Sequence, residues 1–171
     1  MRHLDIKLTE IVNTDVDTSW DIIGPNFTHI AEWSRGVYKS WENETVDNNF
    51  EDAPAGGRYC DVAGFGKFDE RITHFDQEKH EISWSANGEK LPKFIIGLQN
   101  QLTVEEIDDH TCRVTTNITA DMKGLRGMLL GSMISRNFTK TITGFLTDWK
   151  TYAETGHVSD KKQREIERNV H

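Results

Sequence analysis

The sequence has 171 residues, of which 36% are hydrophobic, and its formal net charge is −8. This length suits one domain with a substantial core, and the sequence lacks the run of about 20 apolar residues that spans a bilayer. An acidic chain repels nucleic-acid phosphates and anionic lipid headgroups, so neither nucleic acid nor a membrane surface is an expected partner. The first residues lack the apolar core of a secretory signal, which predicts a cytoplasmic protein.

The sequence offers few residues for metal, redox or nucleophilic chemistry. Cys60 and Cys112 lie far apart without a CxxC motif, so we expect buried strand residues rather than a disulfide or a reactive thiol. The seven histidines follow no metal-binding spacing. We find no nucleophile motif and no phosphate-binding loop before a helix. The sequence therefore predicts neither a metal site nor a cofactor.

The first third of the chain predicts one strand, two short helices and the start of a sheet. Apolar and polar residues alternate over residues 3–12, as in a half-buried strand. Residues 13–15 offer caps for a first helix, which Gly24-Pro25 ends, and a second helix is predicted for residues 26–33. Six further strands follow, predicted at residues 37–46, 58–63, 67–75, 81–86, 94–107 and 111–122.

The last long element is a helix predicted for residues 125–154, which at about 1.5 Å per residue would cross the domain. Its second half has apolar residues at helical spacing, namely Phe138, Ile142, Phe145, Leu146, Trp149 and Tyr152. Its first half mixes leucine and methionine with Gly127 and Gly131, and Gly124 directly precedes it. We expect residues 1–156 to form the domain and residues 157–171 to be a charged tail, loose or a frayed extension of the helix.

Four segments carry a family resemblance: Thr14 to Ile23 with Ser19-Trp20, Phe27 to Trp33, Pro54 to Tyr59, and Glu70 to Asp76. With the order of elements, they resemble the helix-grip fold of the START-like (SRPBCC) superfamily over residues 5–155, in particular its polyketide cyclase/dehydrase type. The resemblance implies an α+β fold in which a curved antiparallel sheet of about seven strands wraps around a long C-terminal helix. It also implies an apolar cavity between sheet and helix, filled by a small hydrophobic molecule.

Strand alternation within that implied cavity selects the candidate ligand-binding residues, which are Trp33, Phe68, Ile72, His74, Trp84, Leu98, Asn100, Leu102, Thr116, Met128, Ser132 and Met133. Asn100 would bind a polar group of the ligand beside His74, or else bond across the strands to Thr116. Gly97 is expected to bulge or kink its strand.

Two candidate acid–base groups stand out. Glu70 would point inward with Ile72, where a carboxyl in an apolar setting suits proton transfer, unless it pairs with Arg58 or Arg71 at a rim. His29 and Glu32 are three residues apart on a short helix, so the carboxylate would orient the imidazole, unless both belong to a solvated helix face.

Three functions remain open from the sequence. The first is binding of an aromatic, polyketide-like or lipid-like molecule, oriented by two or three polar groups. The second is a cyclase, dehydratase or isomerase that uses Glu70 or His29 as its acid or base. The third is a protein-interaction module of the chaperone-activator type. A monomer and a homodimer are both compatible with the sequence.

Overall fold

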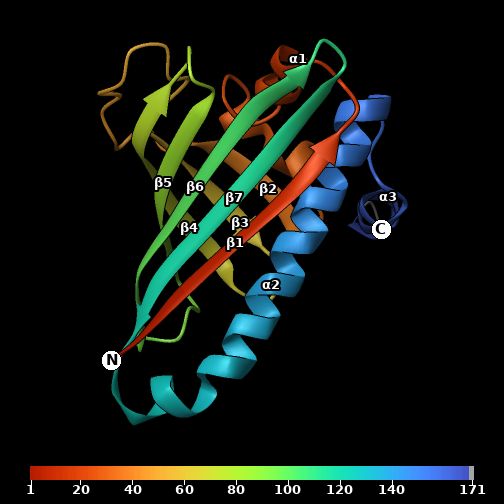
Figure 1. The fold of residues 1–171 in the computed structure, drawn as a ribbon. Helices are drawn as coiled ribbons and strands as arrows, with labels where there is room; N and C mark the ends of the chain where they lie inside the picture. The colour runs from red at the N-terminus through yellow and green to blue at the C-terminus, as the bar shows by residue number, and fades with distance from the viewer. Residues whose placement is uncertain (170–171) are drawn as a thin grey trace.

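The computed structural model describes residues 1–169, in which a seven-stranded antiparallel sheet curves beside one long helix (Figure 1). The α+β helix-grip architecture is therefore confirmed. In chain order the elements are β1 (Arg2–Val12), α1 (Val16–Asp21), η1 (Phe27–Glu32, a 3-10 helix), β2 (Val37–Glu42), β3 (Gly57–Val62), β4 (Gly66–Asp76), β5 (Glu81–Gly88), β6 (Ile95–Asp108), β7 (Thr111–Met122), α2 (Gly124–Thr155) and α3 (Asp160–Asn169).

The strand order in the sheet is β1-β7-β6-β5-β4-β3-β2. Strands β2 to β7 follow one another as a meander, and β1 joins its far edge by pairing with β7 from Arg2 opposite Met122 to Val12 opposite Cys112. Along β1 and β7, the apolar residues of one alternate set are mostly covered, and the other set is mostly polar. We refer to the covered side as the inner face.

Local signals in the sequence explain where the helices begin and end. Asp15 caps α1, because its carboxylate accepts a hydrogen bond from the Thr18 backbone N–H at 2.8 Å. At the other end of the chain, Gly156 closes α2 in the left-handed conformation, with φ of 70°. Both helices therefore end within two residues of their predicted bounds.

The two halves of α2 meet the sheet differently. The second half packs into the core through the predicted apolar stripe, with Ile142, Leu146 and Trp149 buried. The first half touches the end of the sheet through Gly127, Gly131 and Ile134, while its larger side chains are exposed. In Figure 1 this first half continues past the ends of the strands, near the N-terminus.

The segment after α2 corrects the expectation of a loose tail or frayed extension. Asp160–Asn169 forms a separate helix, α3, whose Lys162 is buried and donates to the Val37 carbonyl at 2.8 Å. Ser159 anchors the start of α3 by donating to the buried Asp148 carboxylate of α2 at 2.6 Å. The final two residues, 170–171, lie outside the described part of the chain. Among residues 1–169, no helix combines the length and apolar character needed to cross a membrane.

Candidate functional site

The inner face of the sheet brings together the largest group of predicted ligand-binding residues. Phe68, Ile72, Trp84 and Leu98 all lie on it and are buried. Phe27 of η1 covers this face from above, with its ring edge-on to Trp84 at 5.6 Å between centroids. An aromatic and aliphatic wall of this kind is suited to an apolar ligand.

The Glu70 side chain points to the inner face, but it is ion-paired. The Nε–H of Arg58 donates to Glu70 Oε2 at 2.5 Å, and another guanidinium N–H of Arg58 donates to the Phe27 carbonyl. The pair is not at a rim: the Arg58 side chain is 1% exposed and that of Glu70 is 13% exposed. Arg58 also stacks 3.9 Å above the Phe27 ring. The guanidinium thus fixes the position of the Glu70 side chain, which ligand or solvent can still reach.

The middle of the inner face is only half covered. Leu8, Asn100 and Ile118 lie there on three neighbouring strands and are half-buried, as is Phe138 on the facing side of α2. Asn100 stands opposite Ile118 and Trp84 in the register. Leu102 and Thr116 form the next pair toward α1 and are fully packed into the core. Leu8, Ile118 and Phe138 therefore pack against the core while staying partly open to solvent, and Asn100 is the polar group among them.

The backbone irregularity predicted at Gly97 is confirmed. Gly97 has φ of 60°, and the β6–β7 pairing shifts between Ile96 and Gln99. Because Leu98 and Asn100 follow this bulge, their positions on the inner face depend on it.

The prediction for His74 is wrong. The β4–β5 register shifts between Ile72 and His74, which moves Phe75 into the core and turns His74 to the outer face. Its side chain is 48% exposed and lies 3.4 Å from Glu81 Oε2. His74 and Asn100 therefore do not act on the same ligand, because a bulge reverses the alternation after it.

The predicted positions of Met128, Ser132 and Met133 are also wrong. All three are exposed, because Gly127 and Gly131 occupy the side of α2 that meets the sheet. Ser132 accepts a hydrogen bond from Arg2 at 3.3 Å at the edge of the sheet.

Trp33, a predicted ligand-binding residue, belongs to the core. It is buried against Phe145, Trp149 and Tyr152, with ring centroids 5.2 to 6.4 Å away. Its indole nitrogen and that of Trp84 are two of the three buried side-chain polar atoms without a hydrogen-bond partner in the described residues. Of these two, the Trp84 nitrogen belongs to the inner face, where a ligand acceptor would satisfy it.

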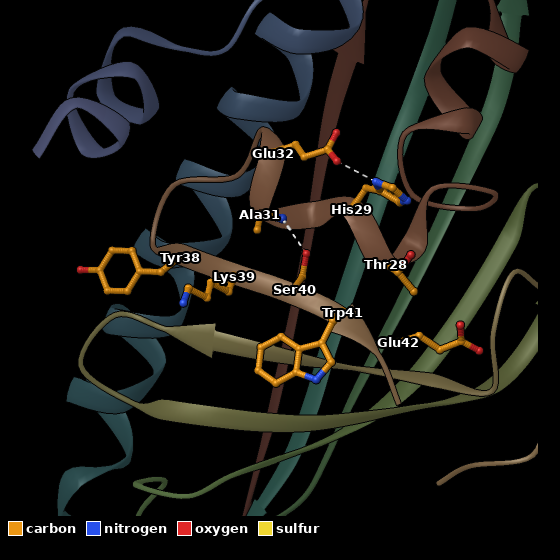
Figure 2. Close-up of a pocket in the computed structure, with 9 residues that line it drawn as sticks. All are labelled: Thr28, His29, Ala31, Glu32, Tyr38, Lys39, Ser40, Trp41 and Glu42. Carbon is orange, nitrogen blue, oxygen red and sulfur yellow. Dashed lines mark hydrogen bonds and ion pairs between the residues drawn. The ribbon is translucent and has the colours of Figure 1, made fainter. Parts of the chain in front are cut away.

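His29 and Glu32 lie in a groove outside the inner face (Figure 2). His29 Nδ1 is 2.7 Å from Glu32 Oε1, and both side chains are more than half exposed, so the contact lies on a solvated face of η1. The groove has a volume of about 650 Å³ between η1 and β2, and Tyr38 and Trp41 of the edge strand also line it. The Ser40 hydroxyl joins the two elements by accepting from the Ala31 N–H at 3.1 Å.

Both cysteines are free and buried, as the sequence predicts. Burial, followed by the nearby Glu70 charge, raises the pKa of the Cys60 thiol well above its ordinary value. Burial also raises the pKa of Cys112. Neither sulfur is therefore a nucleophile at neutral pH. Residues 1–169 contain no cluster of three His, Cys, Asp or Glu side chains that would hold a metal ion.

Sequence reasoning missed the groove wall formed by Tyr38 and Trp41, and the depth at which Arg58 is buried. Trp41 was visible as an aromatic residue in a predicted strand, but its exposure follows from β2 being the edge strand. Arg58 carried no signal beyond its place next to a glycine pair, because a charged residue is normally expected at the surface.

Comparison with known proteins identifies relatives of this arrangement. A family model described as polyketide cyclase/dehydrase and lipid transport matches residues 3–154. A comparison with curated proteins found no match.

Solved structures of the same fold share little sequence. A START superfamily protein from Mycobacterium smegmatis has a TM-score of 0.72 and 12% identity, and the match covers 90% of this chain and 99% of that one. XoxI from Bacillus cereus has a TM-score of 0.65 and 14% identity, with 91% and 95% covered. A point mutant of Thalictrum flavum norcoclaurine synthase, in complex with a transition-state analogue, has a TM-score of 0.66 and 12% identity, with 89% and 94% covered. At these identities the likeness concerns the fold.

Proposed function

Because the chain belongs to the polyketide cyclase/dehydrase and lipid transport family, we propose that it binds a small hydrophobic molecule between the inner face and α2. The observation that carries this proposal is the half-buried state of Leu8, Asn100 and Ile118 on the inner face and of Phe138 on α2. We place the ligand among these residues, in a gap between sheet and helix that it would occupy. Apolar residues in such a gap gain about 25 cal/mol per Å² when a ligand removes them from water.

Polar groups around the gap would orient the ligand. The Glu70 carboxylate is fixed by Arg58 and retains partial exposure, so it accepts a hydrogen bond from a hydroxyl or amine of the ligand. The Asn100 amide offers both a donor and an acceptor. The Trp84 indole N–H adds a donor that no protein group uses. These groups favour an aromatic or polyketide-like ligand with a few hydroxyl or carbonyl groups over a plain fatty acid.

The test begins with mass spectrometry of the purified protein under native and denaturing conditions, followed by thermal-shift measurements with aromatic, sterol and fatty-acid probes. A recurrent co-purified apolar molecule, or a probe that raises Tm, supports the proposal. We expect Ile118→Trp, whose larger side chain would fill the gap, to lower the affinity for the probe at least about tenfold. Thr119→Trp, on the outer face of the same strand, serves as the matched control and keeps full affinity. Equal affinity of both variants would contradict binding in this gap.

An enzyme is the second candidate, and the His29–Glu32 pair at 2.7 Å favours it. A carboxylate that accepts from one ring nitrogen leaves the other free to take a proton from a substrate in the groove. Norcoclaurine synthase, an enzyme by its name, has a similar fold. If this candidate is correct, His29→Gln abolishes turnover of the identified ligand and leaves its binding unchanged. Glu70→Gln tests the inner carboxylate: loss of turnover with unchanged binding would assign the acid–base role to Glu70 instead. Turnover that survives both substitutions would contradict acid–base catalysis by His29 or Glu70.

A further inference from the structure

The first half of α2 carries five large apolar side chains that are exposed to solvent. We call them the α2 patch: Leu125, Met128, Leu129, Leu130 and Met133. Leu125 is 71% exposed and Leu129 is 72% exposed. Single exposed apolar residues are ordinary in proteins, but five within nine positions of one helix form a contiguous apolar surface, which typically marks an interaction site.

Glycine packing explains why these side chains point outward. A Cβ atom on Gly127 would lie 2.9 Å from the Met122 carbonyl carbon, and one on Gly131 would lie 2.6 Å from Arg2 Cδ. At Gly127 the neighbour is backbone and cannot move aside, whereas at Gly131 it is the flexible Arg2 side chain; both glycines are buried on the side of α2 that meets the sheet. At 3.6 residues per turn, Leu125 and Leu129 then fall on the opposite side of the helix.

The charge of this region is opposite to that of the chain. From Met122 to Thr147 the sequence contains Lys123, Arg126, Arg136 and Lys140 and no Asp or Glu, although the net charge of the chain is −8. All four cationic residues are exposed. By helical spacing, Arg136 and Lys140 continue the outward side that Leu125 and Leu129 begin.

Two loops at the same end of the sheet extend this surface. The Lys123 N–H donates to the Phe94 carbonyl at 2.8 Å, and the Lys90 N–H donates to the Phe65 carbonyl at 3.2 Å. Phe65 is exposed, and the loop between β5 and β6 adds Lys90 and Lys93. Four carboxylates also lie at this end, those of Asp5, Asp61, Glu89 and Asp121. Asp121 pairs with the His3 ring, and Glu89 accepts from the Lys67 N–H. The cationic side chains here outnumber them, namely Arg2, Lys67, Lys90, Lys93, Lys123 and Arg126.

We propose that the α2 patch and its flanking lysines and arginines dock the protein on an anionic lipid bilayer. Leucine and methionine enter the boundary between headgroups and acyl chains while basic residues meet the anionic headgroups, which is how interfacial amphipathic helices bind. A second copy of the chain would bring like charges together across the patch, whereas a bilayer supplies both apolar and anionic partners. The expectation that membrane surfaces are not partners relied on the average charge, which conceals this segregation. The docking is peripheral and does not depend on the ligand proposal.

The test is co-sedimentation of the full chain with two kinds of vesicle, one of phosphatidylcholine alone and one of phosphatidylcholine mixed with phosphatidylglycerol in equal parts. We expect binding to the mixed vesicles, weakened by salt, and little binding to phosphatidylcholine alone. Leu125→Ser with Leu129→Ser should weaken binding at least about tenfold through lost apolar insertion. Lys123→Gln with Arg126→Gln should weaken it by about tenfold and reduce its dependence on salt.

Matched controls come from the opposite end of the sheet, where Ile107 and Arg113 are exposed. Ile107→Ser and Arg113→Gln should bind vesicles as the unchanged protein does. Equal and weak sedimentation with both vesicles would overturn the proposal. So would dimerisation in light scattering that Leu129→Ser abolishes while vesicle binding is absent, because a second copy would then cover the patch. Circular dichroism and Tm confirm that each variant is folded, and ligand binding measured separately distinguishes failure of docking from failure of the ligand site.

Discussion

Arg58 is a charged side chain in the position of a core residue. Its guanidinium has no access to water, so its charge depends on Glu70 and on the Phe27 carbonyl. Charges buried in this way are costly when one partner is lost, because the other is left without compensation in an apolar setting.

We therefore predict that Arg58→Ala lowers the free energy of unfolding by about 3 to 5 kcal/mol, measured by urea denaturation. Arg71→Ala is the matched control, because Arg71 pairs with Asp69 in the same sheet but is half exposed. That substitution should cost at most about 1 kcal/mol. Equal losses in the two variants would contradict the role assigned to burial. The double variant Arg58→Met with Glu70→Leu should recover much of the loss, since no lone charge remains.

The first half of α2 depends on a helix approach that only glycine allows. A Cβ atom added to Gly127 would meet the backbone of Met122, which cannot move aside, whereas one added to Gly144 would lie 3.4 Å from Cδ of the flexible Arg35 side chain. Both residues are in the interior of the helix, where glycine costs up to about 1 kcal/mol relative to alanine. The same substitution should therefore have opposite effects at the two positions.

We predict that Gly127→Ala lowers stability by about 1 to 3 kcal/mol, because an added methyl group overpacks the contact. It should also raise hydrogen exchange of the amides in residues 124–134. Gly144→Ala should instead be neutral or stabilise by up to about 1 kcal/mol. Thermal unfolding and hydrogen-exchange mass spectrometry measure both. Stabilisation by Gly127→Ala would mean that the first half of α2 is not held against the sheet.

Helix α3 is held by polar rather than apolar contacts. Asp148 accepts hydrogen bonds from the backbone and side chain of Arg35 and from Ser159. Lys162 and Glu165 bind the neighbouring turn, since Lys162 donates to the Val37 carbonyl and Glu165 accepts from the Gly36 N–H at 2.7 Å. This clamp, formed by Asp148, Lys162 and Glu165, ties α3 to the domain, and α3 itself follows the residues 3–154 that match the family model.

We predict that Lys162→Met releases α3 while the sheet stays folded. A short terminal helix can undock by itself, so the substitution removes only the free energy with which α3 docks, and the rest of the chain stays folded. Limited proteolysis should cut near residues 156–160, and exchange of the α3 amides should rise. Lys161→Met, one position earlier and exposed, should leave both unchanged. Resistance of the Lys162 variant to proteolysis would show that the clamp is not needed.

Most of the fold could be predicted from the sequence because its signals are local. Alternation identified the strands, and apolar spacing identified α2 to within one residue at each end. The candidate site was harder to predict. His74 was misplaced because the β4 bulge, unlike the one at Gly97, has no glycine to mark it in the sequence, and one extra residue reverses every later position. Met128 and Met133 were misplaced because hydropathy assigns large apolar residues to the core, whereas close packing through Gly127 and Gly131 decides which side of α2 faces inward.

The buried polar groups also escaped prediction, for a different reason. Composition assigns Lys162 and Asp148 to the surface, and their partners are distant in the sequence. The cationic region around the α2 patch also escaped prediction, because the net charge of the chain averages over all of its residues. Properties that depend on contacts between distant segments therefore needed the structure.

The position of β1 has a consequence for how the chain folds during synthesis. Thr9 and Thr115 lie side by side in the sheet but are 106 residues apart in the chain. The meander from β2 to β7 can form from neighbouring segments as they leave the ribosome, whereas β1 has no strand to pair with until β7 emerges. Contacts of such long range slow folding. The strand that is translated first is therefore among the last to join the sheet, and for most of translation its apolar side remains open to chaperones or to misassociation.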